Sequence, residues 1–364
     1  LEDVLLFEWL QTMWKLKQNF DEETLYWASM CGLVEMARSG ITSFNEHFDA
    51  YAVEPQIEAL KEIPLRATLG YGFADRGLYA SITDYSWKTI NNFGNLAAQH
   101  HKTRDDLLRI ALSPHAVYSC GEEMWKLCRE VADAHQVPIH THLSEGMQEV
   151  EYCLETYGLR PVQWLHSLGF LGPDVTAGHC SQLDATDIKL LAETGTKIGH
   201  CPVCNAKLGS GTMPLRQVRE AGITVGLATD GPASHNASDM FQEMKFAGLI
   251  HKTNTGDVEF LKINELLEMS TYQGALAMNR PDTGRLEVGA KADVIVVNLD
   301  TAHAQPVYDP MSALVYSTRA DDVRHTIVNG QFIMENGRVL GVDEDLIRAK
   351  FHEKAHALKV RSLC

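Results

Sequence analysis

The sequence has little that would place it in a membrane, cross-link it or attract it to nucleic acid. No apolar run approaches the ~20 residues of a membrane span, and the longest ones, such as Val294–Val297, are as short as a strand. Eight cysteines at irregular positions in 364 residues are too few for a disulfide scaffold and are typical of a reducing cytosol. Lysine and arginine total 32 against 48 acidic residues, a net charge of −16, which disfavours a basic binding face. We expect a cytoplasmic protein without nucleic-acid or membrane partners.

What is present fits a compact enzyme-sized chain. Apolar residues make up 45% and charged residues 22% of the sequence, which are ordinary values for a folded protein. The length suits one barrel-type domain with an appendage. The chain begins at Leu1, and an amphipathic segment with Phe7, Trp9 and Trp14 follows at once. We therefore expect that an N-terminal portion precedes Leu1.

From residue 24 to about 230, amphipathic helices alternate with short buried strands. This alternation predicts a parallel sheet covered by helices. Seven strands are expected at 41–44, 65–69, 108–112, 137–143, 175–177, 196–199 and 223–228. The expected helices are 24–38, 54–62, 121–135, 149–156, 161–168, 185–194, 213–221, 238–251, 263–269 and 271–278. A (β/α)₈ barrel needs eight strands, so we expect an α/β TIM barrel whose first strand lies upstream of Leu1.

The C-terminal quarter changes character. Short strands at 294–299, 323–329, 331–334 and 338–339 are separated by Asn-Gly turns, which indicates β-hairpins. They resemble half of a small antiparallel layer, and a helix over 343–358 follows. We divide the chain into a barrel (1–283), the C-terminal half of a small β-sandwich (284–342) and a C-terminal helix (343–364).

Polar side chains recur where the predicted strands end, and in a barrel these ends surround the active site. The residues concerned are His115, His142 with Glu145, His179, His200 and Asp230. A single histidine after a strand is usually an ordinary loop residue, but a series in register indicates a shared site. Imidazole and carboxylate together suit a divalent ion such as zinc or iron(II).

Three local features allow more than one interpretation. His140 and His142 share a face of one strand, so they could form a bidentate pair, but we favour His140 as a packing residue. Cys201-Pro-Val-Cys204 has no second pair for a zinc ribbon and lies late in the barrel, unlike a thioredoxin motif. We interpret both cysteines as structural thiols. Trp9, Trp14 and Tyr71 could line a pocket or belong to the core.

Several of these segments together resemble the amidohydrolase superfamily. They are Ser-Pro-His115, Ile-His-Thr-His142-Leu-Ser-Glu145, Ala-Gly-His179-Cys, His200-Cys-Pro-Val-Cys-Asn205 and Ala-Thr-Asp230-Gly-Pro-Ala-Ser234. The most similar branch is the cytosine-deaminase-like one, with the methylthioadenosine/S-adenosylhomocysteine deaminases and triazine hydrolases. The resemblance covers nearly the whole chain in order.

The resemblance implies one divalent ion, with zinc first and iron(II) second. Its ligands would be His142, Asp230 and a His-x-His pair expected upstream of Leu1. Hydroxide formed on the metal would attack the substrate, with Asp230 accepting the water proton. Glu145 would transfer a proton to a ring nitrogen, His179 would stabilise the tetrahedral centre, and His115 would bind a polar group of the substrate.

We therefore expect a hydrolytic deaminase that releases ammonia from a small amino-substituted N-heterocycle or nucleoside-like compound, acting as a homo-oligomer. Two departures weaken recognition of S-adenosylhomocysteine. The glutamate expected after Glu8-Trp9-Leu10 is missing, and Tyr71 stands near the position of the carboxylate-binding arginine. The alternatives are a triazine-type hydrolase that displaces chloride or alkylamine and a non-catalytic or truncated member. Triazine chlorohydrolases lack the histidine that this chain keeps as His115.

Overall fold

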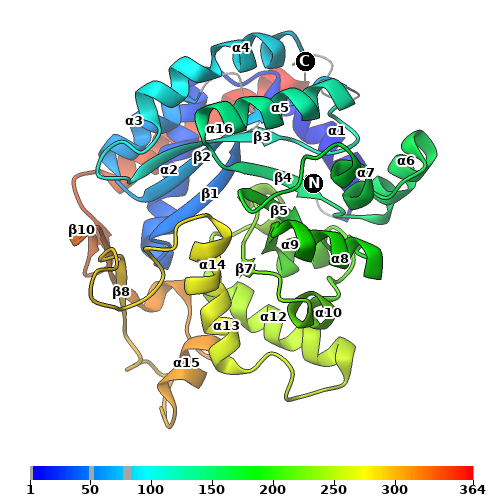
Figure 1. Ribbon diagram of the computed structural model, residues 1–364. Helices are drawn as coiled ribbons and strands as arrows, with labels where there is room; N and C mark the ends of the chain where they lie inside the picture. Colours follow the sequence, from blue (N-terminus) through cyan, green and yellow to red (C-terminus); the bar gives the residue numbers. More distant parts are fainter. Residues whose placement is uncertain (1–2, 49–52, 77–82, 364) are drawn as a thin grey trace.

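The larger part of the chain is built on a seven-stranded parallel sheet. The computed structural model describes residues 3–48, 53–76 and 83–363. The strands follow one another in sequence order: β1 (Ser43–Phe48), β2 (Arg66–Phe73), β3 (Leu108–Pro114), β4 (Ile139–Leu143), β5 (Val175–His179), β6 (Lys197–His200) and β7 (Val225–Leu227). The sheet is strongly curled (Figure 1), but in the part of the chain described β1 does not pair with β7. The predicted α/β class is confirmed, whereas the sheet is open rather than closed.

Helices cover the outer side of this sheet (Figure 1), as the alternating pattern predicts. Their bounds are Leu6–Lys17 (α1), Glu22–Ser39 (α2), Glu54–Glu62 (α3), Thr83–His100 (α4), Glu122–His135 (α5), Met147–Tyr157 (α6), Pro161–Ser167 (α7), Ala185–Thr194 (α8), Pro202–Lys207 (α9), Leu215–Glu220 (α10), Pro232–His235 (α11), Met240–Thr255 (α12), Ile263–Ser270 (α13), Tyr272–Ala277 (α14), Pro310–Tyr316 (α15) and Glu344–Leu363 (α16). Sequence analysis did not predict α4, α9, α11 or α15.

The termini of several elements follow from local chemistry. Asp21 caps α2 by accepting a hydrogen bond from the backbone N–H of Thr24 at 2.7 Å, and Gly40 ends the helix with a φ of 82°. Strand β4 begins at Ile139 rather than at 137, because Pro138 has no N–H for the ladder. Strand β1 runs to Phe48, four residues beyond the predicted end, and this extension changes the composition of the site.

The core fills the space between the sheet and its helices. Apolar side chains of consecutive strands are fully buried there, among them Leu69, Ile110, Leu112, Ile139 and Val175. Strand β7 lies tightly against α14, where a Cβ on Gly226 would come within 2.7 Å of the Cα of Gly274. Glycine at position 226 therefore lets the last strand pack directly on the helix backbone.

A second, antiparallel sheet has the order β11-β10-β9-β8. Its strands are Val294–Val297 (β8), Val323–Val328 (β9), Gln331–Glu335 (β10) and Arg338–Val339 (β11). Asn329 and Gly330 join β9 to β10 with φ values of 51° and 77°, so the predicted Asn-Gly hairpin is confirmed. The C-terminal helix α16 packs on α2 of the larger unit, where Arg38 pairs with Glu344 at 2.9 Å.

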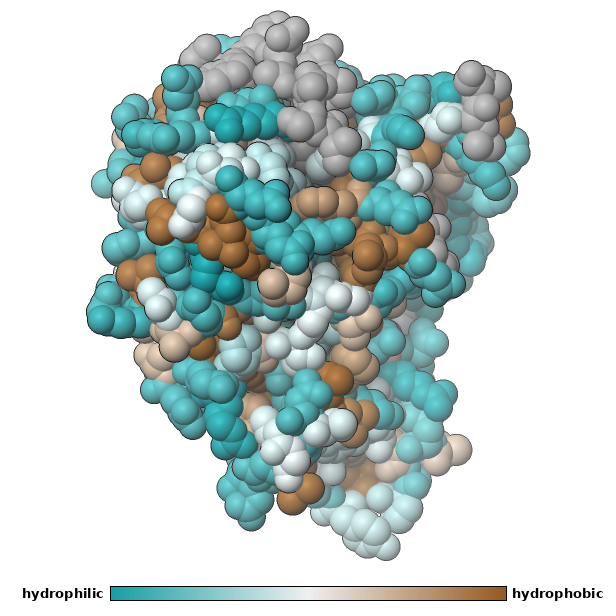
Figure 2. Space-filling view, turned by 90° about the vertical axis from the view of Figure 1, so that its right-hand side faces the viewer, coloured by the Kyte–Doolittle hydropathy of each residue, from teal (hydrophilic) through white to brown (hydrophobic). Residues whose placement is uncertain are grey.

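The surface is mostly polar. The face in Figure 2 is largely hydrophilic, with apolar residues in separate groups between polar ones. Within residues 3–48, 53–76 and 83–363, no helix is both long enough and apolar enough to cross a membrane.

Candidate active site

The carboxyl ends of neighbouring strands bring most of the predicted residues together. His142 lies on β4, His179 ends β5, and Asp230 follows β7. The register places Leu143 opposite His179, so the two histidine-bearing strands end side by side. One potential ligand atom each of His142, His179 and Asp230 lies within 4.8 Å of the others. The three residues therefore surround one small volume.

The hydrogen bonds of two histidines determine which ring nitrogen faces the site. Nδ1 of His142 lies 3.0 Å from the backbone carbonyl of His115, which only accepts, so Nδ1 carries the proton and Nε2 the lone pair. Nδ1 of His115 lies 2.8 Å from Oγ of Ser119, whose own proton goes to the carbonyl of Ala116. His115 also donates through Nδ1. Both imidazoles therefore keep Nε2 as an acceptor or metal ligand.

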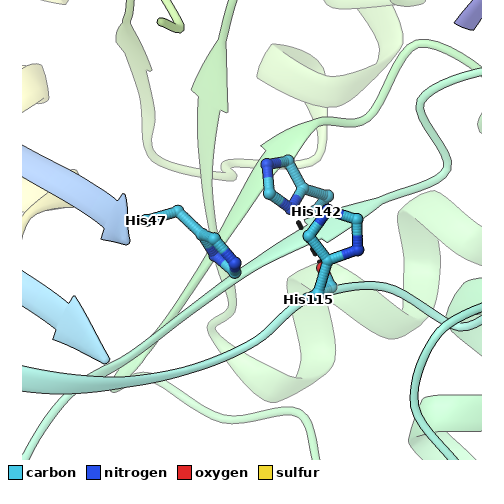
Figure 3. Close-up of side chains that lie close together, drawn as sticks. All are labelled: His47, His115 and His142. Atoms are coloured by element: carbon cyan, nitrogen blue, oxygen red, sulfur yellow. Dashed lines mark hydrogen bonds between the residues drawn. The ribbon is translucent and has the colours of Figure 1, made fainter. Parts of the chain in front are cut away.

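His47 is a site residue that sequence analysis missed. It comes from the end of β1 and points toward His115 and His142 (Figure 3), with ring centroids 5.4 Å and 4.4 Å away. The ligand atoms of these three residues also lie within 4.8 Å of one another. The predicted strand ends at Phe44 and does not include His47. Phe48 lies four residues after Phe44 and is a strong β-former. It is the signal in the sequence that would have extended the predicted strand.

Glu145 and His179 form a buried pair beside the first cluster. Oε2 of Glu145 lies 3.7 Å from Nε2 of His179. Burial raises the pKa of the Glu145 carboxyl, an effect that the nearby His179 partly offsets. On the other side of the His179 ring, the side-chain amide of Asn205 donates to Nδ1 at 3.2 Å, which leaves the proton on Nε2. A raised pKa makes a carboxyl better suited to hold and donate a proton, as general acid catalysis requires.

Glu149 supports the loop that carries Glu145, and sequence analysis did not identify it. Its carboxylate accepts hydrogen bonds from the backbone N–H groups of Ser144 at 3.0 Å and Glu145 at 2.7 Å. Burial raises the pKa of Glu149 to about 7, although these bonds act in the other direction. The predicted helix began at residue 149, whereas α6 begins at Met147. Because α6 begins two residues earlier than predicted, Glu149 lies in its first turn, where its carboxylate reaches the backbone of Ser144 and Glu145.

Asp230 remains a carboxylate despite its surroundings. Burial acts to raise its pKa, but His179 and hydrogen bonds from Ser234 and Cys204 outweigh burial and lower it. The thiol of Cys204 donates to Oδ2 at 3.1 Å, and the hydroxyl of Ser234 donates to the same oxygen. Oδ1 is therefore the oxygen available to a cation. Cys201 and Cys204 are buried free thiols, but the contact between Cys204 and Asp230 was not anticipated.

The backbone is strained at two of these residues. His179 and Asp230 have φ values of 70° and 61°, in the left-handed region that costs non-glycine residues about 1–3 kcal/mol each. Neither conformation is favoured locally, so the surrounding packing must maintain both. The strained backbone therefore occurs at the residues that form the candidate site.

Other candidate residues lie outside the cluster. His200 follows the strand-end pattern, but its Nε2 lies 2.9 Å from Nε2 of His251 in a separate buried pair. His140 shares a strand face with His142 yet belongs to none of the ligand groups among the residues described. Trp14 and Tyr71 are part of the hydrophobic core, and the Trp14 ring also contacts His115 with centroids 5.8 Å apart.

The donor set fits a divalent cation. His142 offers a neutral nitrogen because burial, reinforced by the neighbouring histidines, holds its pKa well below the usual value. Asp230 offers a charged oxygen. Neutral imidazole and carboxylate are ligands that zinc and iron(II) accept. The strand-end position, the buried acid and the convergent ligands are together the features that a metal-assisted hydrolase site requires.

Comparison with known proteins gives the family. The model of the "Amidohydrolase family" matches residues 1–333. A 5-methylthioadenosine/S-adenosylhomocysteine deaminase of Syntrophobacter fumaroxidans is 37% identical over 98% of this chain and 81% of its own length. A 5'-deoxyadenosine deaminase of Methanosarcina barkeri is 36% identical over 99% of this chain and 82% of its own. The chain belongs to the amidohydrolase family, as the sequence motifs predicted.

Solved structures agree with this assignment. A zinc-bound adenosine deaminase from Xanthomonas campestris superposes with a TM-score of 0.92 at 29% identity, covering 99% of this chain and 81% of that one. A zinc-bound atrazine chlorohydrolase from Arthrobacter aurescens superposes with a TM-score of 0.89 at 25% identity, covering 97% of this chain and 83% of that one. The prediction of a hydrolase acting on carbon–nitrogen bonds other than peptide bonds is confirmed.

Proposed function

We propose that this protein is a hydrolytic deaminase that removes the 6-amino group of a 5'-deoxyadenosine-type nucleoside, such as 5'-methylthioadenosine. The observation that carries this proposal is the buried Glu145–His179 pair next to His142 and Asp230. The relatives named as deaminases of such nucleosides support the substrate class. The absence of a recognised carboxylate-binding arginine favours nucleosides without the amino-acid moiety of S-adenosylhomocysteine.

The proposed roles follow from the protonation states. His142 and Asp230 hold the divalent ion, for which we propose zinc; when bound, such an ion lowers the pKa of water to about 7. Asp230, kept ionised, accepts a proton from the water that adds to the carbon bearing the amino group. Glu145, whose pKa burial raises, donates a proton to the adjacent ring nitrogen, which neutralises the negative charge that the addition creates. His179 donates through Nε2 to the new oxygen.

The second half of the reaction restores the aromatic ring. The proton on Asp230 is transferred to the amino group, the carbon–nitrogen bond breaks, and ammonia leaves as the carbonyl forms. Glu145 recovers its proton from the hydroxyl of the tetrahedral centre. His115 keeps Nε2 as an acceptor, and we propose that it binds a polar group of the substrate.

We also propose the finer architecture that sequence analysis predicted. The curled sheet corresponds to the (β/α)₈ barrel of the family over residues 1–283, and the antiparallel sheet over 284–342 corresponds to part of a small β-sandwich. The high TM-scores with zinc-bound family members support this proposal. We propose that the protein is cytoplasmic and forms a homo-oligomer. Free thiols are typical of a reducing compartment and support the proposed location. Size-exclusion chromatography with light scattering tests the assembly.

A substrate panel tests the proposed function. Adenosine, 5'-deoxyadenosine, 5'-methylthioadenosine and S-adenosylhomocysteine are incubated with the metal-loaded protein, and ammonia and the deaminated nucleoside are quantified. We expect the 5'-deoxy compounds to react fastest. Glu145→Gln should lower kcat by about 10²–10⁴-fold, because the amide cannot supply the proton. Glu151→Gln, on the exposed side of α6, is the matched control and should leave kcat unchanged.

A triazine hydrolase is the second candidate, because atrazine chlorohydrolase has nearly the same fold. Atrazine and its amino analogue are therefore included in the panel, and chloride is measured beside ammonia. Release of chloride at a higher kcat/KM than any nucleoside deamination would replace the first proposal with this one.

A further inference from the structure

Glu145, His179 and Cys204 form a second group of convergent metal ligands beyond the one proposed for catalysis. One ligand atom of each lies within 4.8 Å of the others, and all three side chains are buried. The residues come from three different segments: the loop after β4, the end of β5 and helix α9. In the proposed reaction Glu145 and His179 move protons, and Cys204 only donates to Asp230.

Charge distinguishes this group from the three histidines of Figure 3. His47, His115 and His142 offer only imidazole nitrogens, so their side chains bring no negative charge to offset the double charge of a buried divalent ion. Glu145 as carboxylate and Cys204 as thiolate carry two negative charges, which cancel those of the ion. Sulfur, nitrogen and oxygen ligands together suit zinc, and the sulfur adds a preference for softer ions such as cadmium.

His179 can present a lone pair to this ion after a small rearrangement. At present Asn205 donates to Nδ1, and its own Oδ1 is buried without a hydrogen-bond partner in the part of the chain described. A half-turn of the Asn205 amide places Oδ1 against Nδ1, where it accepts the ring proton. Nε2, which faces Glu145, then becomes available as a ligand.

We propose that Glu145, His179 and Cys204 form an inhibitory site for a second, thiophilic divalent cation, distinct from the catalytic one. The inference rests on the proposed function for its inhibitory consequence, because the ion occupies both proton-transfer groups. On binding, the Cys204 S–H bond breaks and the sulfur–metal bond forms, Glu145 gives up the proton that it carries in the proposed reaction and binds as a carboxylate, and both protons are released to solvent. The hydrogen bond to Asp230 is lost, and no electron is transferred.

Cadmium titration of the protein already loaded with one zinc ion tests the site. We expect one additional equivalent to bind, a cadmium–thiolate absorption band to appear in the ultraviolet, and deaminase activity to fall in step. Cys204→Ser replaces the soft sulfur ligand with a hydroxyl of similar size, and its readouts are the absorption band and the bound cadmium, both measured without substrate. In this variant the band should vanish and the affinity for cadmium should fall by roughly tenfold or more. Cys201→Ser is the control and should behave like the wild type.

Three results would overturn the proposal: a band that persists in Cys204→Ser, a band that depends on Cys201, or one-for-one displacement of zinc without a thiolate signal. Band and stoichiometry are measured without substrate, so they decide the site even if no deaminase activity is found. Conversely, an active deaminase that cadmium does not inhibit would refute this inference and leave the proposed function intact.

Discussion

The two ends of the parallel sheet both bury charged groups but use them differently. At the amino ends, Arg66 is fully buried and binds Asp293 through two hydrogen bonds of 2.6 Å and 2.9 Å. Arg280 donates nearby to the carbonyls of Asp106 and Ala67. At the carboxyl ends, His142, Asp230 and their neighbours instead converge on one small volume. Paired buried charges join parts of the fold, whereas side chains that converge on one volume are suited to bind a ligand.

This contrast teaches how to separate structural from functional polar residues. The Arg66–Asp293 pair connects strand β2 to the segment before β8, so its partner is another part of the chain. The site residues instead show strained backbone at His179 and Asp230, together with altered pKa values. Substitutions at the two ends should therefore affect different properties.

The largest effect is expected at Asp230. Asp230→Asn keeps the volume but removes the charge that holds the cation and accepts a proton, so kcat/KM should fall by about 10³–10⁴-fold or more. Bound metal, measured by atomic emission, should fall with it. The free energy of unfolding without metal should change only slightly, because asparagine keeps an oxygen that can accept the hydrogen bonds from Ser234 and Cys204. A variant that unfolds more easily but stays active would break the contrast.

The opposite end should show the reverse behaviour. Arg66→Met leaves Asp293 buried without its partner and should lower the free energy of unfolding by about 3–5 kcal/mol. The specific activity of the molecules that remain folded should be unchanged. Arg38→Met, at the exposed pair with Glu344, is the matched control and should cost at most about 1 kcal/mol. Urea unfolding of both variants checks the difference.

Glu149 combines features of Asp230 and Arg66, because its carboxyl supports the fold but lies inside the candidate site. Its folded pKa of about 7 lies above the ordinary value of 4.5, so its stabilising contribution is complete below pH 4.5 and is lost as the pH rises through 7. The loss is on the order of 3 kcal/mol. The free energy of unfolding of Glu149→Gln should therefore change less between pH 4.5 and 8 than that of the wild type. Glu151→Gln should keep the full pH dependence of the wild type. Equal slopes in all three proteins would contradict this assignment.

The smallest effect is expected at Ser119, which orients the His115 ring. Ser119→Ala removes one hydrogen bond to Nδ1, worth about 1 kcal/mol, and should reduce kcat/KM roughly fivefold. If His115 binds the substrate, the change should appear mainly in KM. An unchanged KM with a lower kcat would instead move His115 into the chemical step.

Much of the fold could be predicted because its patterns are local. Helical periodicity, glycine stops and Asn-Gly turns lie within short windows, and they placed the seven strands and most helices. His142, Glu145, His179 and Asp230 could be found because a parallel sheet gathers its strand ends at one edge. His47 was missed because the end of β1 depends on pairing with β2 rather than on its own residues.

The sequence by itself determined the alternation of strands and helices, the residue types at the strand ends and the motifs of the family. Only the tertiary structure decided which of those side chains meet: His200 faces His251, and Cys204 faces Asp230. It also raised the pKa values of Glu145 and Glu149, because burial has no signature in a short stretch of sequence. The physical reason is that desolvation and strained backbone arise from groups far apart in the chain.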